Sequence, residues 1–535
     1  MKTMISSIIL ASCLALPLAS CSDSDVAPEQ KDWSTTTYFY SADAAMQDTY
    51  YKPTVGYVGD PMPFFDPVAG DFKVLYLQDF RPNPEGTYHP IWGVSTKDAA
   101  HYTSLGELVA CGTKKSQDAA IGTGSTIYDE ASKLYYTFYT GNKYLPTGDE
   151  SAQAVMVATS PDFKTWTKDR TFLLKGQDFG YDKNDFRDPF VFKGDDGKFH
   201  MLVSTKKSGK GSLAEFVSDD LKNWTDNGVF MTMMWDRFYE CPDLFKMGDY
   251  WYLVYSEIHH AVRRVQYFKG RTLDELKACT ANDVARWPDA HEGFLDSRGL
   301  YAGKTASDGT NRYLWGWCPT RSGKDNTAVG ASPAEPEWAG NLVCYKLIQH
   351  EDGTLTLGQI DAVSEKYNQD VAVEVKESQN MTEADGTYTL AGSVEQPDAY
   401  MLMGRLGNHN KISFTITTSN EWDKFGISMV RGSDSKKYYT MVVNPENENN
   451  RKVNFEEQGV EGKGFIAGID GYVFARPADN VYNVTIYTDN SICVMYINDV
   501  CSYTNRIYGI QKNCWSINSY NGANVKISNL KISQY

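Results

Sequence analysis

The chain contains many short stretches in which apolar residues alternate with polar ones, and long amphipathic helical patterns are scarce. Valine, tyrosine, phenylalanine, tryptophan and threonine are common in these stretches, and clusters of glycine, aspartate, asparagine and proline separate them. Alternation of these residue types is typical of β-strands, and the separating clusters are typical of turns. The pattern therefore predicts an all-β protein.

A polar turn followed by an aromatic residue recurs in the first two-thirds of the chain. The copies are residues 95–98 before Tyr102, residues 160–162 before Trp166, and residues 218–220 before Trp224. Each copy follows a strand-like run, and the similar spacing favours a repeated unit over chance recurrence of a common turn. A repeat of this length in a β protein fits one four-stranded propeller blade. Residues 34–360 have room for about five such units, which predicts a five-bladed β-propeller.

A second β domain is expected after the propeller. Apolar periodicity fades over residues 361–371, the predicted linker, and strand patterns resume over residues 372–535. The clearest strands are expected at residues 387–394, 411–418, 424–431, 437–443, 480–488, 492–498 and 525–532. These strands predict an antiparallel β-sandwich that resembles a lectin-like jelly roll more than an immunoglobulin domain. The expected fold class is thus all-β, a five-bladed β-propeller followed by a C-terminal β-sandwich.

The first residues have the pattern of an export signal. Lys2 precedes an apolar stretch over residues 4–18, too short to cross a membrane as a helix, and Leu18-Ala19-Ser20-Cys21 follows. This end resembles a bacterial lipobox, in which the cysteine is lipidated and becomes the mature N-terminus. We expect a signal peptide over residues 1–20 and a linker over residues 21–33, lipid-anchored at Cys21. The expected location is the outer membrane or cell surface, with the periplasm or soluble export as alternatives.

Charge and cysteine content narrow the range of partners. The formal net charge of −16 argues against nucleic acid as a binding partner, because its phosphates are negatively charged too. The eight cysteines after Cys21 include no C-x-x-C pair, so a zinc site is not expected. An exported location permits disulfides, whose connectivity the sequence leaves open.

Three short stretches place carboxylates beside proline or aromatic residues. They are Gly59-Asp60-Pro61, Arg187-Asp188-Pro189 and Glu240-Cys241-Pro242. Their spacing puts them on different blades, where the first residues of the innermost strands face the central cavity. Glycoside hydrolysis requires two acids, of which one protonates the leaving oxygen and the other attacks carbon or activates water. A third acid beside an arginine can stay ionised and stabilise positive charge in the transition state. Asp60 alone would be read as a turn residue, but the three acids together indicate catalysis.

The order of these motifs resembles glycoside hydrolase family 32, the fructan hydrolases and invertases. That family carries W-M-N-D-P-N-G, then R-D-P, then E-C, and this chain has Asp60-Pro61, Arg187-Asp188-Pro189 and Glu240-Cys241 in the same order. Trp338-Ala339-Gly340 is similar to a late propeller motif of the family. The resemblance covers nearly the whole chain after the export signal.

The resemblance implies a role for each acid. Asp60 would be the nucleophile that forms a covalent fructosyl intermediate, Glu240 the acid and then the base, and Asp188 the stabiliser of the transition state. Because the family retains configuration, the carboxyl groups of Asp60 and Glu240 should lie about 5–5.5 Å apart. The implied sugar-binding residues are Gln78, Trp92, Thr123, Arg187 and Trp338. The implied activity is hydrolysis of β-fructosidic bonds in fructans or fructo-oligosaccharides, and no metal or organic cofactor is implied.

Several positions depart from the family pattern. Gly59 and Met62 replace the two asparagines around the nucleophile, and Lys304 replaces the glutamine of Y-A-P-Q. In the second domain, Val494 replaces the glutamate of a family strand motif. The three acids match the family pattern, whereas residues expected around the sugar differ from it. The resemblance therefore indicates the type of reaction more closely than it indicates the substrate.

Two other functions remain as alternatives. An inverting hydrolase of arabinan or xylan, similar to family 43, would share the propeller and an Asp-Pro motif, with carboxyl groups more than about 6.5 Å apart. The R-D-P and E-C motifs argue against it. A non-catalytic surface glycan-binding protein is the second alternative, and the presence of all three acids argues against it.

Overall fold

A computed structural model describes most of the chain. The described residues are 49–80, 87–233, 238–257, 264–279, 292–321, 336–431, 438–445, 451–458, 472–511 and 513–535. The predicted signal peptide, the linker over residues 21–33 and the lipidated Cys21 lie outside the described residues. No helix among the described residues is long and apolar enough to cross a membrane.

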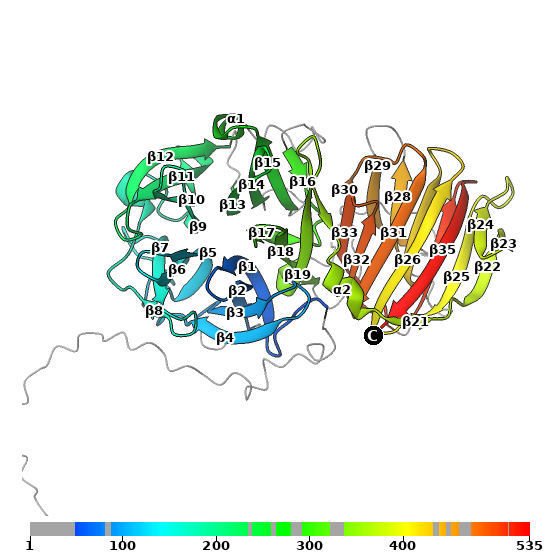
Figure 1. Cartoon of the computed structure of the whole chain (residues 1–535), viewed down its shortest axis with the longest axis horizontal. Coiled ribbons are helices and arrows are strands. Elements are labelled where there is room, and N and C mark those ends of the chain that lie inside the picture. Colours follow the sequence, from blue (N-terminus) through cyan, green and yellow to red (C-terminus); the bar gives the residue numbers. More distant parts are fainter. Residues whose placement is uncertain are drawn as a thin grey trace, which may run out of the picture.

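The first domain consists of four antiparallel sheets (Figure 1). The largest contains β17 (Tyr301–Ser307), β18 (Arg312–Arg321), β19 (Pro336–Gln349), β1 (Tyr57–Asp66), β2 (Asp71–Asp79), β3 (Ile91–Thr96) and β4 (Thr103–Val109), and β20 (Leu355–Gly358) pairs with β19. The second contains β5 (Ala120–Asp129), β6 (Leu134–Asn142), β7 (Gln153–Ser160) and β8 (Thr167–Lys168). The third contains β9 (Phe186–Lys193), β10 (Phe199–Lys207), β11 (Lys210–Ser218) and β12 (Thr225–Thr232). The fourth contains β13 (Glu240–Met247), β14 (Tyr250–Glu257), β15 (Arg264–Gly270) and β16 (Glu292–Phe294).

The sheets are arranged around a centre as in a propeller (Figure 1). The innermost strands contact one another in the cyclic order β1, β5, β9, β13 and β17, and β17 in turn contacts β1. The short helices η4 (Gly176–Phe179), α1 (Leu273–Ala278) and α2 (Asp361–Lys366) lie outside the sheets. The starts of the inner strands therefore face one another, as the sequence predicted for the strands that carry the acids.

The three recurring turns are confirmed. They follow β3, β7 and β11, each the third strand from the centre of its blade-like unit. In each turn an aspartate carboxylate accepts backbone N–H groups, and the next residue, Ala99, Phe163 or Leu221, has a positive φ. An aspartate side chain satisfies the free N–H groups of such a turn, which explains why this sequence pattern recurs.

Each inner strand has a β-bulge near its start. The register against the neighbouring strand shifts between Gly59 and Met62, Gly122 and Gly124, Arg187 and Phe190, Glu240 and Asp243, and Tyr301 and Lys304. A bulge inserts an extra residue, bends the strand and redirects side chains. The bulges define two layers: an outer layer of Gly59, Gly122, Arg187, Glu240 and Tyr301, and an inner layer of the residues that follow each of them.

The second domain is a sandwich of two antiparallel sheets. One contains β23 (Met381–Ala384), β24 (Thr387–Ala391), β35 (Asn524–Gln534), β26 (His409–Thr418), β31 (Val481–Asp489), β32 (Ile492–Ile497) and β33 (Cys501–Arg506), and β21 (Gln369–Val371) pairs with β35. The other contains β22 (Val375–Gln379), β25 (Ala399–Arg405), β34 (Cys514–Tyr520), β27 (Lys424–Arg431), β28 (Tyr438–Pro445), β29 (Arg451–Gln458) and β30 (Tyr472–Val473). A strand is present at every sandwich position where the sequence predicted one.

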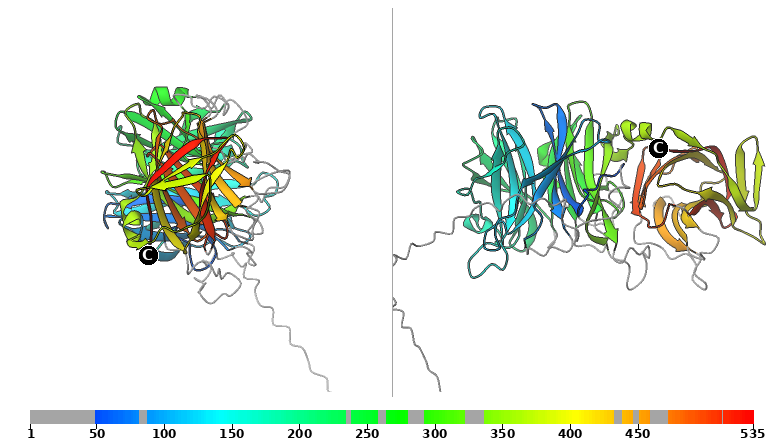
Figure 2. Two further views of the ribbon diagram at one scale, coloured as in Figure 1. Left: turned by 90° about the vertical axis from the view of Figure 1, so that its right-hand side faces the viewer. Right: turned by 90° about the horizontal axis from the view of Figure 1, so that it is seen from below.

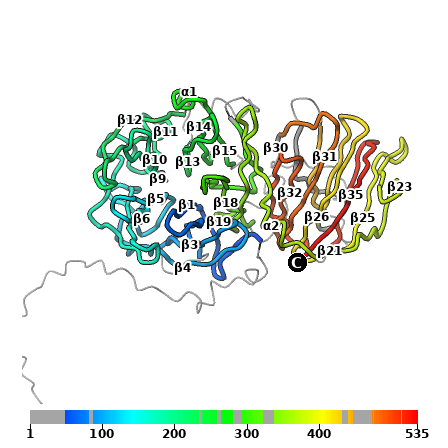
Figure 3. The backbone as a smooth tube through the Cα atoms, in the orientation of Figure 1, coloured from blue at the N-terminus to red at the C-terminus, as the bar shows by residue number. Residues whose placement is uncertain are grey.

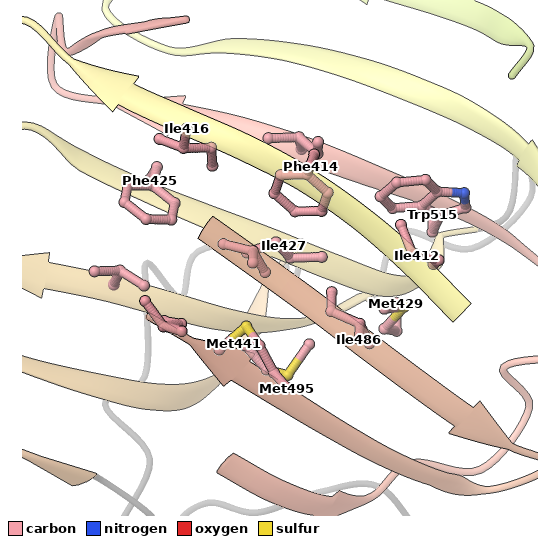
Figure 4. Close-up of a cluster of buried hydrophobic side chains, with 14 of the residues drawn as sticks. Ile412, Phe414, Ile416, Phe425, Ile427, Met429, Met441, Ile486, Met495 and Trp515 are labelled. Atoms are coloured by element: carbon pink, nitrogen blue, oxygen red, sulfur yellow. The ribbon is translucent and has the colours of Figure 1, made fainter. Parts of the chain in front are cut away.

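Alternation along β26 shows how the sequence builds this sandwich. Ile412, Phe414 and Ile416 are buried, whereas the residues between them are half-buried. Together with Phe425 and Ile427 of β27 they fill the space between the two sheets (Figure 4). Because side chains alternate across a strand, one face of each sheet is buried against the other.

The two domains lie side by side along the long axis of the molecule, with α2 between them (Figures 2 and 3). One cluster of buried side chains includes residues of both, among them Trp315 and Tyr345 from the propeller and Val494 and Tyr496 from the sandwich. Val494 thus packs at the junction, where the glutamate of the family motif would be buried in an apolar cluster. Residues 361–371, the predicted linker, contain α2 and β21.

All eight cysteines after Cys21 lie in the described residues, and no disulfide joins any of them. Seven are buried, and Cys514 is half-buried.

Candidate active site

The three predicted acids lie at the starts of three inner strands. Asp60 is on β1, Asp188 on β9 and Glu240 on β13. Asp60 and Asp188 occupy equivalent positions in the inner layer, whereas Glu240 occupies the outer layer. The three acids therefore lie near the centre of the propeller, two in the inner layer and one in the outer layer.

Asp60 is held by two neutral donors. The Thr123 hydroxyl donates to Oδ2 at 2.7 Å, and the Trp317 indole N–H donates to Oδ1 at 3.0 Å. Burial raises the pKa of Asp60, the two hydrogen bonds oppose this rise, and the negative charge of Glu240 adds to it. Within the part of the chain that the structure describes, both oxygens accept from neutral donors and no cation is hydrogen-bonded to them, which suits a carboxylate that attacks carbon.

Glu240 has polar partners, in contrast to the apolar residues next to it in the chain. Arg187 donates to Oε1 at 2.9 Å, and the Tyr301 hydroxyl donates to Oε2. Arg187, Glu240 and Tyr301 all belong to the outer layer of neighbouring strands, which explains why they meet. Burial raises the pKa of the Tyr301 hydroxyl, so it remains a donor at neutral pH.

Asp188 is the most buried of the three acids, with 4% of its surface exposed. Its backbone has a positive φ of 56°, and its Oδ2 accepts the backbone N–H of Cys241 at 2.9 Å. Burial raises its pKa to about 6; Arg187 acts in the opposite direction, and Glu240 adds to the rise. A non-glycine residue with this φ is strained, and such strain is common where a side chain must be aimed.

Arg187 is fixed on three sides. It pairs with Asp185 at 2.8 Å as well as with Glu240, and its guanidinium lies 3.8 Å from the centre of the Phe238 ring. Coulombic attraction to Asp188 and Glu240 raises the pKa of Arg187 against the effect of burial. The guanidinium is therefore a permanent positive charge beside two of the acids.

Lys304 is a second cation near the acids, 2% exposed. Its ammonium donates to the Gly124 carbonyl at 2.8 Å and lies 5.3 Å from the centre of the Phe190 ring. Burial lowers the pKa of Lys304, while neighbouring acidic groups that include Asp188 and Asp60 act in the opposite direction. The glutamine-to-lysine departure thus places a buried amine among the clustered carboxylates, which favour its charged form while burial disfavours it.

Gly59 leaves space for an indole ring. A Cβ at this position would lie 2.2 Å from Cη2 of Trp338, so the ring covers the backbone next to Asp60. The asparagine of the family motif would not fit beside Trp338 in this arrangement. Gly59 and Trp338 therefore form one wall of the site together.

The other predicted sugar-binding residues differ in their positions. Thr123 and Arg187 contact the acids directly. Gln78 is fully buried, and its amide donates to the Val55 carbonyl at 2.6 Å. Trp92 is half-buried and packs edge-on against Phe80 at 5.9 Å. Among the described contacts, neither Gln78 nor Trp92 is hydrogen-bonded to an acid.

A cavity of about 630 Å³ lies elsewhere, between β4 and β8. Its lining includes Glu107, Asp118, Trp166 and Arg170, and none of the predicted site residues. The three acids at the inner strands lie outside this cavity, so we assign it no part in the site.

The sequence did not identify Tyr301 and Trp317 as site residues. Tyr301 immediately precedes a bulge, as Arg187 and Glu240 do. Trp317 lies in the motif Leu314-Trp315-Gly316-Trp317, whose alternation places it on the same face as Trp315. The bulge is seen only in the folded chain, and the acids that these residues contact lie on other strands, so the sequence offers no local signal for either contact.

Two family models match the chain. The model described as "Glycosyl hydrolases family 32 N-terminal domain" matches residues 50–360, more than half of the chain. The model described as "GH32, BT1760-like, C-terminal domain" matches residues 353–532.

Curated relatives match about half of the chain. An insoluble β-fructofuranosidase isoenzyme of Arabidopsis thaliana is 27% identical in an alignment of 320 positions that covers 54% of this chain and 51% of the plant protein. An invertase of Debaryomyces hansenii is 28% identical in an alignment of 282 positions that covers 48% of this chain and 49% of the yeast protein. The chain thus spans about half the length of the curated relatives that it matches.

Solved structures match over both domains. Fructan 1-exohydrolase IIa of Cichorium intybus has a TM-score of 0.68 at 16% identity, covering 91% of this chain and 97% of the plant enzyme. The β-fructofuranosidase of Bombyx mori has a TM-score of 0.64 at 17% identity, covering 91% of this chain and 93% of the insect enzyme. At these identities the likeness shows the shared fold, a propeller followed by a sandwich.

Proposed function

The chain belongs to glycosyl hydrolase family 32, and from this premise we propose that it hydrolyses β-fructosidic bonds in fructans or fructo-oligosaccharides with retention of configuration. The observation that carries the proposal is the set of three acids, each held by different partners. Asp60 has neutral donors, Glu240 has a cation on one oxygen, and Asp188 is buried. Groups with such different environments suit different roles in one reaction.

In the first step, an oxygen of Asp60 attacks the anomeric carbon of the fructosyl unit. The bond from this carbon to the leaving oxygen breaks, and its electron pair stays on the leaving oxygen. Glu240 gives that oxygen a proton. Because Arg187 holds Oε1, the proton belongs on Oε2, the oxygen beside Tyr301.

In the second step, a water molecule replaces the sugar that left. Glu240 is now ionised and takes a proton from this water, whose oxygen attacks the anomeric carbon. The bond to Asp60 breaks, and its carboxylate is regenerated. Two inversions give net retention.

Asp188 acts without changing its bonds. Ionised, it places a negative charge near the developing positive charge of the fructosyl ring, and the Cys241 N–H fixes its orientation. Arg187 offsets the repulsion between Asp188 and Glu240. The stabilising charge is thus fixed in place before the reaction, which is how electrostatic catalysis works.

A substrate panel tests this function. The protein is incubated with levan, inulin, sucrose, arabinan and xylan, and the products are separated by chromatography. We expect fructose or fructo-oligosaccharide from the first three only, and a loss of about 10⁴-fold in rate for Asp60→Ala. Release of arabinose or xylose would favour the inverting alternative, and Asp60→Ala and Glu240→Ala proteins that behave like wild type would reject the site assignment.

We further propose that the propeller has five blades, over residues 34–360, with the sandwich over residues 372–535. The support is the cyclic contact order of five inner strands, each with the same bulge. The eight-stranded sheet would then be two blades joined where Val58 of β1 pairs with Gly340 of β19.

Export and lipidation at Cys21 complete the proposal. The support is the short apolar stretch that ends in Leu18-Ala19-Ser20-Cys21. Labelling of a bacterial host with a radioactive fatty acid should label the wild-type protein and leave Cys21→Ser unlabelled. Equal labelling of the two proteins would contradict lipidation at this residue.

A further inference from the structure

One position of the propeller recurs beside the acids. On the strand next to each inner strand, one buried residue pairs with the outer-layer residue of that inner strand, and we call this the paired position. The residues at the paired position are Leu77 on β2, Thr140 on β6, Ser204 on β10, Ser256 on β14 and Trp317 on β18. In three of these five cases the side chain donates or accepts a hydrogen bond at the start of the next inner strand in the cyclic order.

Thr140 uses one hydroxyl group to contact the backbone of two bulges. Its Oγ1 donates to the Thr123 carbonyl at 2.9 Å and accepts the Asp188 N–H at 2.8 Å. Both Thr123 and Asp188 lie within the register shifts, where neither has a paired residue on the neighbouring strand of its sheet. A threonine hydroxyl can donate one hydrogen bond and accept others, so it satisfies both of these backbone groups.

This hydroxyl connects the supports of two acids. Thr123 donates from its own side chain to Asp60 Oδ2 at 2.7 Å, so the bond from Thr140 fixes the backbone that carries this donor. The bond to the Asp188 N–H holds a residue whose φ is 56° and whose carboxylate accepts the Cys241 N–H. A positive φ is costly for aspartate and persists only where surrounding contacts maintain it.

Ser204 and Trp317 make comparable contacts beside the other acids. The Ser204 hydroxyl donates to the carbonyl of Tyr239, the residue directly before Glu240. The Trp317 indole donates to Asp60 Oδ1 at 3.0 Å. The paired position therefore contacts the chain at each of the three acids, through the carboxylate in one case and through the backbone in the other two.

The two remaining paired positions lack this contact. Leu77 has an apolar side chain, and the next inner strand, β5, carries none of the three acids. The Ser256 hydroxyl has no hydrogen-bond partner among the residues that the structure describes, and the next inner strand, β17, also carries none of the acids. If these contacts served only to join neighbouring sheets, they would be expected at all five positions. Instead they occur where an acid follows.

We propose that Thr140 and Ser204 are positioning residues for the hydrolysis, each holding the backbone of the next inner strand so that its acid is aimed at the reacting carbon. This inference rests on the proposed function. Neither hydroxyl contacts a carboxylate, so both act through other residues. Small displacements of reacting groups slow the chemical step strongly, which predicts a larger effect on kcat than on KM.

Thr140→Val tests the proposal, because valine has nearly the shape of threonine and lacks the hydroxyl. It leaves the Thr123 carbonyl and the Asp188 N–H without their partner. We expect kcat on sucrose to fall by about 10–100-fold, with a much smaller change in KM. Thr140→Ser keeps the hydroxyl and should recover most of the lost rate.

Thr137→Val is the matched control for Thr140→Val. Thr137 is also fully buried on β6, and its hydroxyl pairs with the Thr126 hydroxyl at 2.8 Å. This variant loses a buried hydrogen bond on the same strand without affecting the backbone of Thr123 or Asp188, so its kcat should equal that of wild type. A kcat for Thr140→Val no lower than that of Thr137→Val would overturn the role of Thr140.

The pH dependence of kcat/KM separates positioning from a loss of stability. Burial raises the pKa of Asp188, and the hydrogen bond from the Cys241 N–H lowers it. If Asp188 moves in Thr140→Val and this bond is lost, its pKa rises further, and the fall of kcat/KM on acidification begins at higher pH than in wild type. Thr140→Ser and Thr137→Val should keep the wild-type profile. A wild-type profile in Thr140→Val would contradict the proposed positioning of Asp188.

Ser204→Ala is a smaller change that tests the proposal independently of how Thr140→Val folds. It removes the donor to the Tyr239 carbonyl, and we expect kcat to fall by about 5–50-fold. Ser256→Ala is the matched control, because it removes an equally buried hydroxyl from the equivalent position of β14. Its kcat should equal that of wild type. Equal kcat values for Ser204→Ala and Ser256→Ala would overturn the role of Ser204.

The failure of the proposed function would look different. A wild-type protein that releases no fructose from any substrate contradicts that function, whatever the variants do. The positioning role is then judged from crystal structures of Thr140→Val and Thr140→Ser. Loss of the bond between Asp188 and the Cys241 N–H in the valine variant alone supports the role, and an unmoved Asp188 in that variant rejects it.

Discussion

At the scale of single residues, charge around the acids decides what each can do. Asp188 is surrounded by opposing influences: burial favours its neutral form, Arg187 favours the ionised form, and Glu240 repels a second negative charge. The resulting pKa of about 6 lies well above the ordinary value of about 3.9 for aspartate. Asp188 is therefore mostly ionised at pH 7 and mostly protonated at pH 5.

This pKa predicts the pH dependence of the reaction. Because Asp188 stabilises positive charge only when it is ionised, kcat/KM should fall as the pH is lowered through about 6. Asp188→Asn should keep the hydrogen bond from Cys241 and lose about 10²–10³-fold in kcat at pH 7. Rates on sucrose measured from pH 4 to pH 8 check both. A wild-type rate that stays constant from pH 7 down to pH 4.5 would be inconsistent with this role.

At the scale of elements, the bulges place the catalytic groups. The same register shift at the start of each inner strand puts Asp60, Thr123 and Asp188 at equivalent positions. Glu240 comes one residue earlier, in the layer of Arg187 and Tyr301. Asp60 and Glu240 therefore lie in different layers, and each accepts a hydrogen bond from a residue of its own layer, Thr123 for Asp60 and Arg187 for Glu240.

The indole of Trp338 packs directly against the backbone of β1 at Gly59, and this contact can be tested by substitution. Gly59→Ala puts a Cβ into the space of the indole, so Trp338 or β1 must move. We expect kcat/KM to fall by about 10–100-fold, because small displacements of reacting groups are costly. Trp338→Phe combined with Gly59→Ala should recover part of the loss on sucrose.

Gly404→Ala is the matched control for Gly59→Ala. Gly404 is also in a strand, and a Cβ there would lie 3.3 Å from the carboxylate end of Glu374 and at ordinary contact distance, 3.7 Å or more, from other atoms. Its rate should equal that of wild type. An unchanged rate for Gly59→Ala would show that Trp338 does not constrain the position of Asp60.

The sequence predicted the acids because each stands in a short motif, and it predicted the strands because alternation is local. It did not predict Tyr301 and Trp317 as partners, since they lie 61 and 257 residues from the acids that they contact. No local pattern indicates which strands become neighbours around the centre. Gln78 was expected at the sugar pocket from its motif alone; its amide donates to the Val55 carbonyl before β1, and its place at the pocket stays a prediction.

At the scale of the whole molecule, the sandwich contacts the propeller strands that carry the site. Arg506 of β33 is 3% exposed and donates to the Cys318 carbonyl at 2.9 Å, the Pro319 carbonyl at 3.1 Å and the Asn341 amide oxygen at 2.6 Å. Cys318 directly follows Trp317, which donates to the nucleophile. One buried guanidinium thus connects the sandwich to β18 and β19.

The contact predicts a structural role for the sandwich in catalysis. Arg506→Met leaves three buried acceptors without their donor, which should lower the free energy of unfolding by about 2–4 kcal/mol. Because β18 also positions Trp317, kcat on sucrose should fall as well. Thermal unfolding and rate measurements check these effects, with the exposed Arg405→Met as control. A thermal midpoint equal to wild type would contradict the role of Arg506.

In the proposed mechanism Asp60 forms a covalent bond to the fructosyl unit, and this bond can be trapped. Glu240→Ala is mixed with an activated fructosyl fluoride, whose fluoride leaves without a proton from the enzyme. Without Glu240 to activate water, the intermediate should accumulate. Mass spectrometry of the digested protein should then show one fructosyl unit on the peptide that contains Asp60. An unmodified Asp60 peptide after consumption of the fluoride, or a fructosyl unit on another residue, would contradict the mechanism.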